Sequence, residues 1–155
     1  MNIRIANEND FESVKRITQT TIKAVYPKYY PAGAVQFFCD HHSDEKILED
    51  IKANRVYLLE NEENEVGTVT ICGNEINRLF VLTKYQHMGY GRALMDFAEK
   101  MISKETDTSV LDASLPAKKI YLLRGYKETA YNIIKTDNSD YLCFDVMERH
   151  IGGKE

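Results

Sequence analysis

The chain has 155 residues, which is the size of one domain that can bury most of the surface of its unfolded form. Its 20 basic and 24 acidic side chains give a formal net charge of −4 without a basic block, which argues against a nucleic-acid partner. No run approaches the roughly 18 consecutive apolar residues of a membrane span, and the first residues lack the apolar segment of a signal peptide. We therefore expect a soluble, cytoplasmic protein with no membrane partner.

The three cysteines lie far apart and form no C-x-x-C pair, which predicts free thiols and no metal site; they are Cys39, Cys72 and Cys143.

Apolar periodicity predicts a strand over residues 2–6 and then a helix that is capped by Asn9 or Asp10 and ends before Pro27. A tyrosine-rich segment, residues 26–42, follows and contains a short apolar run for which we predict no element. Ser43 is a favourable cap for a second helix. Polar turns then separate three strands of a meander, at 55–60, 65–72 and 75–82.

The stretch 77–104 predicts a strand, a glycine turn and a long amphipathic helix. Gly89 and Gly91 fall at the start of this helix, where the first N–H groups lack intrahelical partners and the helix dipole is positive. Backbone without side chains can close around an anion there, so the stretch predicts a phosphate-binding loop.

The remaining chain predicts a strand at 109–113, a helix from Ser114 to Gly125 and a closing hairpin of 126–135 and 140–148. We expect one domain over residues 1–150 and a frayed tail over 151–155. The whole order is strand, two helices, three strands, helix, strand, helix and two strands, which indicates an α+β fold.

Two common phosphate loops do not match the glycine turn. A nucleoside-triphosphate loop requires Lys followed by Ser or Thr after its last glycine, but Arg92 and Ala93 follow Gly91. A dinucleotide loop requires a third glycine at the position of Leu94.

The segment Gln86–Gly91 instead fits the pattern Q/R-x-x-G-x-G/A, and Ser114–Tyr126 fits the pattern N/S-x-x-A-x-x-F-Y-x-x-x-G-F/Y. With these two segments in order, the chain resembles the GNAT superfamily of acetyl-CoA-dependent N-acetyltransferases over essentially its whole length. It departs from the common pattern at Thr83, Ser114 and Ile120, where proline, asparagine and phenylalanine are usual. None of these changes removes a group that the chemistry needs.

The resemblance implies a three-layer fold with a mixed, mostly antiparallel sheet of about six to seven strands, helices on both faces, and strands that splay at the acetyl-CoA site. It implies acetyl-CoA as cosubstrate and no metal. The residues implied to bind the donor are Phe80, Val81, Leu82, Gln86, His87, Met88, Gly89, Tyr90, Gly91, Arg92, Ser114, Ala117 and Tyr121.

Two catalytic residues follow from the resemblance. Tyr121 occupies the tyrosine position of the family, and a phenol with a pKa of about 10 can protonate a leaving thiolate. Glu75 matches an acidic position in many relatives and is the candidate base, acting through water. A solvated carboxylate at a strand end remains the alternative for Glu75.

The resemblance places the acceptor against residues 26–42 and the last hairpin. An aromatic wall there would consist of Tyr26, Tyr29, Tyr30, Phe37 and Phe38, although packing between helices is the alternative that the sequence favours. His41 and His42 have suitable chemistry for a base, but adjacent histidines in a polar loop are more often surface residues.

We therefore predict an N-acetyltransferase that moves acetyl directly to a primary amine of a small molecule or peptide. The alternatives are a non-catalytic acyl-CoA sensor or protein-interaction module and an enzyme for longer acyl groups. A homodimer is possible.

Overall fold

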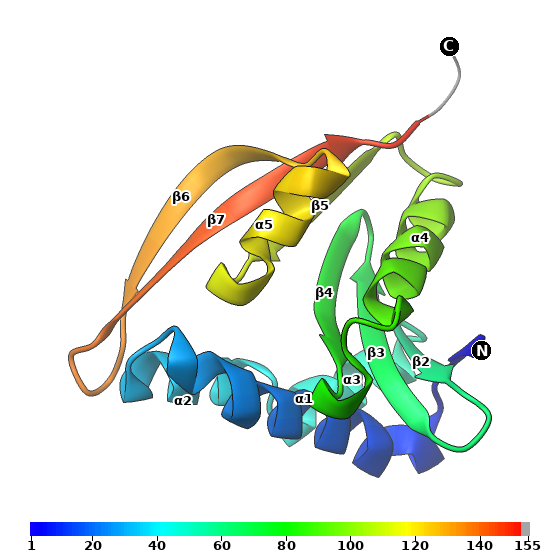
Figure 1. The fold of residues 1–155 in the computed structure, drawn as a ribbon, viewed down its shortest axis with the longest axis horizontal. Coiled ribbons are helices and arrows are strands. Elements are labelled where there is room, and N and C mark those ends of the chain that lie inside the picture. Colours follow the sequence, from blue (N-terminus) through cyan, green and yellow to red (C-terminus); the bar gives the residue numbers. More distant parts are fainter. Residues whose placement is uncertain (153–155) are drawn as a thin grey trace.

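The computed structural model describes residues 1–152, which form a seven-stranded sheet in the order β1-β2-β3-β4-β5-β7-β6 (Figure 1). The strands are β1 (Asn2–Ile5), β2 (Val56–Glu60), β3 (Glu65–Cys72), β4 (Glu75–Val81), β5 (Thr108–Ala113), β6 (Lys127–Lys135) and β7 (Tyr141–His150). The helices are α1 (Phe11–Val25), α2 (Ala32–His41), α3 (Asp44–Lys52), α4 (Tyr90–Ile102) and α5 (Leu115–Arg124).

Every neighbouring strand pair is antiparallel except β4 and β5, which are parallel. These two strands pair only through Glu75–Val110 and Ile76–Leu111. Beyond Ile76, β4 stays paired with β3, while β5 stays paired with β7. The sheet therefore opens between its fourth and fifth strands, and the mixed, splayed sheet predicted from the sequence is confirmed.

Helices cover both faces of the sheet, and each face has its own apolar core. On one face, α4 packs Leu94, Met95, Ala98 and Ile102 against residues such as Leu111. On the other face, α1, α2 and α3 bury residues such as Val14, Ile17, Ala34 and Ile47. Figure 1 shows α1 and α2 running beneath the sheet, with α4 and α5 on the opposite side of β4 and β5. The opening between β4 and β5 thus lies between two separately packed layers.

Two expectations differ from the structure. The tyrosine-rich segment contains a helix, α2, so three helices precede β2 rather than two. Pro31 is extended at its N-cap, and the ten residues Ala32–His41 carry apolar side chains on several sides, so the segment lacks the single stripe that identifies an amphipathic helix. At the other end, Ile151 and Gly152 donate hydrogen bonds to the Asp107 carbonyl at 2.7 and 3.1 Å. These two residues of the predicted tail are therefore attached, and the rest of the tail lies outside the described residues.

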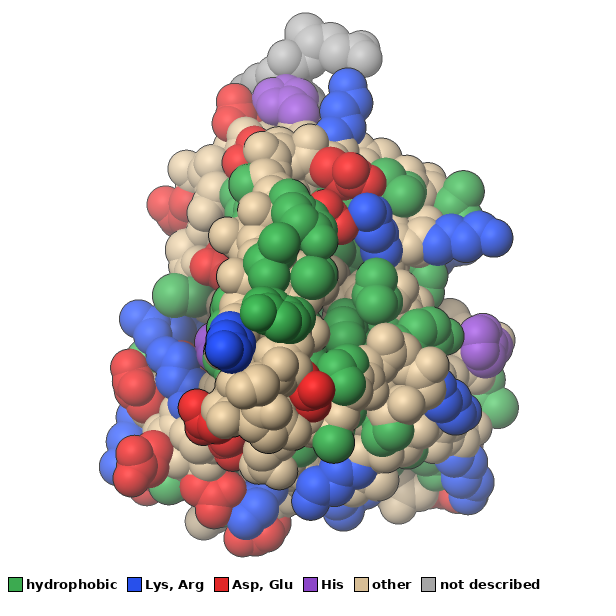
Figure 2. Space-filling view, turned by 90° about the vertical axis from the view of Figure 1, so that its left-hand side faces the viewer, with side chains coloured by type: hydrophobic (Ala, Val, Ile, Leu, Met, Phe, Trp, Pro, Cys, Tyr) green, Lys and Arg blue, Asp and Glu red, His purple; other side chains and the backbone are tan. Residues whose placement is uncertain are grey.

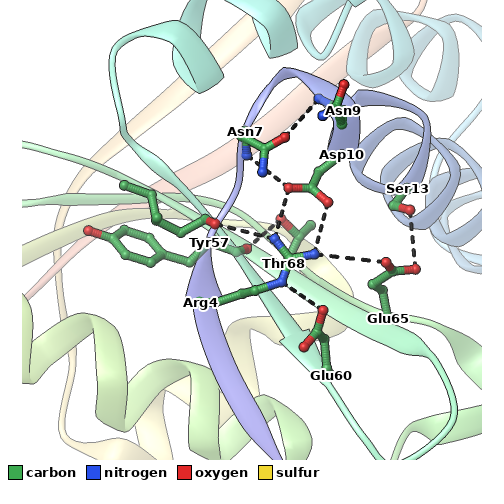
Figure 3. Close-up of polar contacts among 10 residues, drawn as sticks. Arg4, Asn7, Asn9, Asp10, Ser13, Tyr57, Glu60, Glu65 and Thr68 are labelled. Atoms are coloured by element: carbon green, nitrogen blue, oxygen red, sulfur yellow. Dashed lines mark hydrogen bonds and ion pairs between the residues drawn. The ribbon is translucent and has the colours of Figure 1, made fainter.

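A polar network fastens the first strand to the rest of the sheet (Figure 3). Arg4 on β1 donates two hydrogen bonds of 2.8 Å to the carboxylate of Asp10 and one of 2.7 Å to Glu60 on β2. Asp10 also accepts the Asn7 amide at 2.8 Å, which closes a capping box before α1. One arginine thereby holds the first strand, the start of the first helix and the second strand together.

The edge of the sheet formed by β6, together with part of β7, exposes apolar side chains to solvent. Tyr131 and Ile133 on β6 and Tyr141 on β7 are each about 60% exposed (61%, 60% and 58%). Figure 2 views the molecule from this side and shows hydrophobic side chains gathered among charged ones. Among the described residues, no helix is long and apolar enough to cross a membrane.

Candidate active site

A bulge in β4 shapes the opening of the sheet. Between the pairs Thr68–Phe80 and Thr70–Asn77, β4 has two residues where β3 has one. The extra residue is accommodated at Arg78, whose φ of 44° is unusual for a residue with a side chain. Ile76 and Val81 consequently belong to the α4 core, whereas Arg78 bonds to Asp50 of α3 on the other face.

The opening leads into a cleft of about 380 Å³ that is lined from both faces of the sheet. From the α4 and α5 side the cleft is lined by Val81, Gln86, His87, Gly91, Met95, Ala117 and Tyr121. From the α1 and α2 side it is lined by Thr21, Val25, Tyr26, Phe37, Phe38, His41, His42, Phe80, Ile134, Leu142 and Phe144. We call these the loop side and the aromatic side of the cleft. Because the lining comes from both core layers, two molecules can meet in the cleft from opposite faces of the sheet.

The loop side contains a row of free backbone N–H groups. The Gln86 side chain donates to the Val81 carbonyl at 2.9 Å, which fixes the loop to the end of β4. His87 and Gly89 then take positive φ angles of 63° and 89°, and α4 starts at Tyr90. Within residues 1–152, the amides from His87 to Arg92 have no hydrogen-bond acceptor, and Ala93 makes the first helical bond, to the Gly89 carbonyl.

These free amides fit an anionic group such as a phosphate. Where right-handed and left-handed backbone conformations alternate, successive N–H groups point into one concavity that can bind an anion. The positive end of the helix dipole of α4 strengthens the attraction for an anion there. At Gly89 and Gly91, a Cβ would meet no atom within 4 Å, so the space in front of this backbone is open. The positive φ at position 89 favours glycine. At position 91 the backbone conformation does not require glycine, so a glycine is needed there only if a ligand approaches the backbone closely.

Tyr121 projects from α5 into the loop side. It is 8% exposed, and its ring centroid lies 5.9 Å from that of Tyr126. The neighbouring phenol of Tyr126 is fixed by Glu99 at 2.9 Å and by Ser109 at 2.8 Å. Burial, followed by the proximity of Tyr126, raises the pKa of Tyr121 to about 12. The Tyr121 phenol therefore keeps its proton at neutral pH and can donate it to a group in the cleft.

A buried network of charged and polar side chains backs the aromatic side. Arg78 donates to Asp50 and to Thr70 at 2.9 Å each, and its Nε donates to His42 Nδ1 at 3.3 Å. Because Nδ1 accepts, the neutral His42 ring carries its hydrogen on Nε2. Burial, followed by the positive charge of Arg78, lowers the pKa of His42 to about 3. His42 is thus a fixed neutral hydrogen-bond donor, and the expectation of a surface histidine is wrong, since His42 is only 8% exposed.

Three further titratable groups lie near the point where β4 and β5 separate. Asp112 of β5 and His41 of α2 both line the cleft. Both residues are solvent-exposed, and their partial desolvation raises the pKa of Asp112 and lowers that of His41. Glu75 lies at the start of β4 and is not part of the cleft lining; burial, followed by the charge of Asp112, raises its pKa. The sequence pattern gave no reason to select Asp112, because only the divergence of the strands brings it to the cleft.

In the tyrosine-rich segment, some aromatic side chains line the cleft and another connects the segment to α5. Tyr26 and Phe37 line the cleft, and Tyr26 packs edge-on against Phe38 with ring centroids 4.6 Å apart. Tyr30 does not line the cleft; its hydroxyl accepts the Leu115 amide at 2.7 Å, at the start of α5. Tyr29 is 50% exposed and does not line the cleft.

Among the residues predicted to bind the donor, the cleft lining contains Phe80, Val81, Gln86, His87, Gly91, Ser114, Ala117 and Tyr121. The others lie in or beside the same loop without lining the cleft; they are Leu82, Met88, Gly89, Tyr90 and Arg92. In the described part of the chain, no three His, Cys, Asp or Glu side chains form a group that could hold a metal ion.

The profile of the acetyltransferase (GNAT) domain family matches residues 25–142, which include the β4–β5 opening and the glycine loop. The chain belongs to the GNAT acetyltransferase family. A search of curated protein sequences found no significant match.

Solved structures with the same fold include GNAT enzymes with low sequence identity. A GCN5-related N-acetyltransferase from Rhodopseudomonas palustris has a TM-score of 0.87 at 18% identity, and the match covers 96% of this chain and 94% of that one. The PaiA N-acetyltransferase of Thermoplasma acidophilum, solved in complex with coenzyme A, has a TM-score of 0.72 at 22% identity over 96% and 98% of the two chains. YncA of Salmonella typhimurium, a putative acetyltransferase solved with acetyl-CoA, has a TM-score of 0.74 at 13% identity over 100% and 96%.

Proposed function

We propose that this GNAT protein is an N-acetyltransferase that uses acetyl-CoA to acetylate a primary amine directly. The observation that carries the proposal is the cleft through the sheet, which has free amides and a protonated phenol on one side and carboxylate and aromatic groups on the other. Acetyl-CoA bound on the loop side would supply an activated acetyl group. The amides of residues 87–92 would hold its phosphates, and the open backbone edge at the end of β4 would face its pantetheine arm.

Tyr121 has the position and protonation state of a proton donor to the departing sulfur. The raised pKa of Tyr121 would make proton transfer from its phenol to the sulfur unfavourable if the thiol had its aqueous pKa of about 8.5. A thiol in the same buried place would also have a raised pKa, so the difference between the pKa values of the phenol and the thiol is smaller in the cleft than in water. The acceptor must be a neutral amine at attack, so a carboxylate near the opening, Glu75 or Asp112, would take its proton.

A spectrophotometric assay of thiol release, with acetyl-CoA and a broad panel of primary amines, tests the proposal. Transfer of acetyl to at least one amine, identified by mass spectrometry, is the expected result. Tight binding of acetyl-CoA with no transfer to any amine would favour the non-catalytic acyl-CoA sensor. A separate thermal-unfolding experiment compares the stabilisation by acetyl-CoA with that by longer acyl-CoAs and reports the acyl preference.

A further inference from the structure

His42 has a ring N–H at the wall of the cleft that has no partner in the described chain. Its Nδ1 accepts the hydrogen bond from Arg78 Nε at 3.3 Å, so the hydrogen of the neutral ring is on Nε2. Within residues 1–152, Nε2 makes no hydrogen bond. The fully enclosed side-chain polar atoms without a partner in the same residues are the hydroxyls of Thr18 and Thr21, so Nε2 is not enclosed. Because His42 lines the cleft, this N–H is available to a molecule bound there.

The position and the tautomer of the His42 ring are fixed by its neighbours. Only 8% of the residue is exposed, and its ring packs edge-on against the rings of Phe80 and His41, with centroids 5.8 and 5.0 Å away. Arg78 is itself held by Asp50 at 2.9 Å. Turning the imidazole over would leave a donor of the buried guanidinium without its acceptor, which is costly. His42 is therefore a preorganised donor rather than a mobile side chain.

The surroundings of this N–H strengthen a hydrogen bond made there. Most of the wall on this side is apolar, with Phe37, Phe38 and Phe144 among its members. A hydrogen bond is electrostatically stronger in such an environment, and the bond from Arg78 polarises the imidazole that donates the next one. Water can occupy the position in the free protein, and a ligand that displaces the water must supply its own acceptor to avoid a loss of affinity.

The ligand group that suits this donor is an uncharged carbonyl oxygen. A carbonyl accepts without having to donate, whereas a hydroxyl would also need an acceptor, and the phenyl rings of the wall supply none. A carboxylate is disfavoured, because the charge of Arg78 is already balanced by Asp50 and Asp112 adds another carboxylate to the same cleft.

We propose that His42 Nε2–H donates a hydrogen bond to a carbonyl oxygen of the acceptor, and that the acceptor is a primary amine with an uncharged carbonyl group and an apolar body. This inference rests on the proposed acetyltransferase function and adds to it a specificity-determining residue and a substrate class. His42 holds the acceptor in place and transfers no proton.

Pairs of amines that differ only in the carbonyl group provide the test, with acetyl-CoA as donor. The pairs are phenylalaninamide with 2-phenylethylamine and leucinamide with 3-methylbutylamine. The variant His42→Asn keeps an acceptor for Arg78, but its shorter side chain does not reach the position of Nε2. For at least one pair, it should lower kcat/KM about tenfold for the amide and less than about twofold for the simple amine.

Comparing the variant with the wild type for each amine cancels the difference in basicity between the two members of a pair. Equal effects of His42→Asn on both members of both pairs would overturn the inference. Thermal unfolding with and without coenzyme A shows whether the variant is folded and retains the donor site.

His41→Asn is the matched control. His41 also lines the cleft, but its side chain is exposed to solvent and is not fixed by Arg78. This variant should change the kcat/KM of both members of a pair by the same factor. A loss selective for the amides in His41→Asn, with none in His42→Asn, would contradict the assignment of the donor to His42.

Nuclear magnetic resonance of the wild type gives a test that does not depend on the folding of a variant. A proton–nitrogen correlation spectrum of the imidazole side chains at pH 7 should show His42 with its hydrogen on Nε2. In the presence of coenzyme A, which has no acetyl group to transfer, the Nε2–H signal should shift on addition of one of the two amides and not on addition of its simple amine. A signal that neither amide moves would overturn the inference.

The two measurements distinguish this inference from the proposed function. A His42 signal that responds to an amide, with no acetylation of any amine, would contradict only the proposed function. Acetylation of these amines with equal losses in His42→Asn within each pair would contradict only the inference.

Discussion

At the scale of single residues, the Tyr121 phenol has the clearest chemical assignment. It is buried in the loop side of the cleft, and its raised pKa keeps it protonated. We predict that Tyr121→Phe lowers kcat by roughly 100-fold, the lower end of the usual contribution of an acid or base catalyst. Coenzyme A should still raise the melting temperature of the variant as it does for the wild type. A variant with undiminished kcat would exclude Tyr121 as proton donor.

His42 predicts a pH dependence of folding. Its pKa is lowered to about 3 in the folded protein, whereas an unfolded histidine titrates near 6.5. Below pH 6.5 the unfolded chain binds a proton that the folded chain does not, so the free energy of unfolding falls as the pH falls. The variant His42→Asn keeps an acceptor for Arg78 but has no histidine to titrate at this position. From pH 7 to pH 5, the unfolding free energy of the wild type should therefore fall by about 2 kcal/mol more than that of the variant.

Urea denaturation at the two pH values measures this shift, and the exposed His87 offers a control through His87→Asn. Equal pH dependence in the wild type and His42→Asn would mean that His42 ionises freely while folded.

The residues around the cleft show where sequence reasoning stops. Gln86, Gly91 and Tyr121 could be predicted as site residues because the two segments that carry them are continuous in the chain. Arg78, His42 and Asp112 could not be placed at the cleft from the sequence. Their positions depend on a bulge, on the end of an unexpected helix and on two strands that separate. Each of these is a relation between distant segments, and local residue patterns do not contain it.

At the scale of elements, the junction of the glycine loop with α4 can be tested without harm to the fold. Gly91 has no positive φ, and an added Cβ would meet open space. Alanine is favoured over glycine in a helix, so Gly91→Ala should raise the free energy of unfolding by about 0.5 kcal/mol. It should nevertheless weaken coenzyme A binding at least tenfold, because the Cβ would occupy the space in front of the free amides.

Gly73→Ala is the matched control for this loop. Gly73 also faces open space, but its φ is +61°, so alanine is strained there. This variant should lose stability and keep its affinity for coenzyme A. Both properties can be read from thermal unfolding with and without coenzyme A, and unchanged affinity in Gly91→Ala would argue against phosphate contact at this backbone.

The elements themselves were largely predictable. Strand alternation, caps and turn residues located the meander, α4, α5 and the closing hairpin in the right order, because each has a local signal. The exception is α2. Its ends are set by Pro31 and by the packing of Tyr26, Tyr30 and Phe38 on one another, which are tertiary contacts.

At the scale of the whole molecule, Arg4 tests how the N-terminal strand is held. Asp10 is 8% exposed, and the hydrogen bond from Arg4 is the main cause that holds its pKa below the usual value. Arg4→Gln should lower the free energy of unfolding by about 2 kcal/mol at pH 7, since it leaves a nearly buried carboxylate without its cation.

This stabilisation has a definite pH window. Because the folded pKa of Asp10 is depressed, its contribution is complete above the unfolded pKa of about 4 and is lost as the pH falls through the folded value. The difference between wild type and Arg4→Gln in denaturant unfolding should therefore shrink from pH 7 to pH 3. A constant difference would mean that Asp10 is not the partner that matters.

The gap between β4 and β5 is bounded at one end by the two residue pairs Glu75–Val110 and Ile76–Leu111. Beyond the end of β5, the Tyr30 hydroxyl accepts the Leu115 amide at 2.7 Å and Asp140 accepts the Gly33 amide at 2.8 Å, so the residues around the start of α2 are attached to α5 and to the β6–β7 turn. Two molecules that enter the gap from opposite faces of the sheet need not pass one another. We therefore expect that either can bind or leave while the other stays in place.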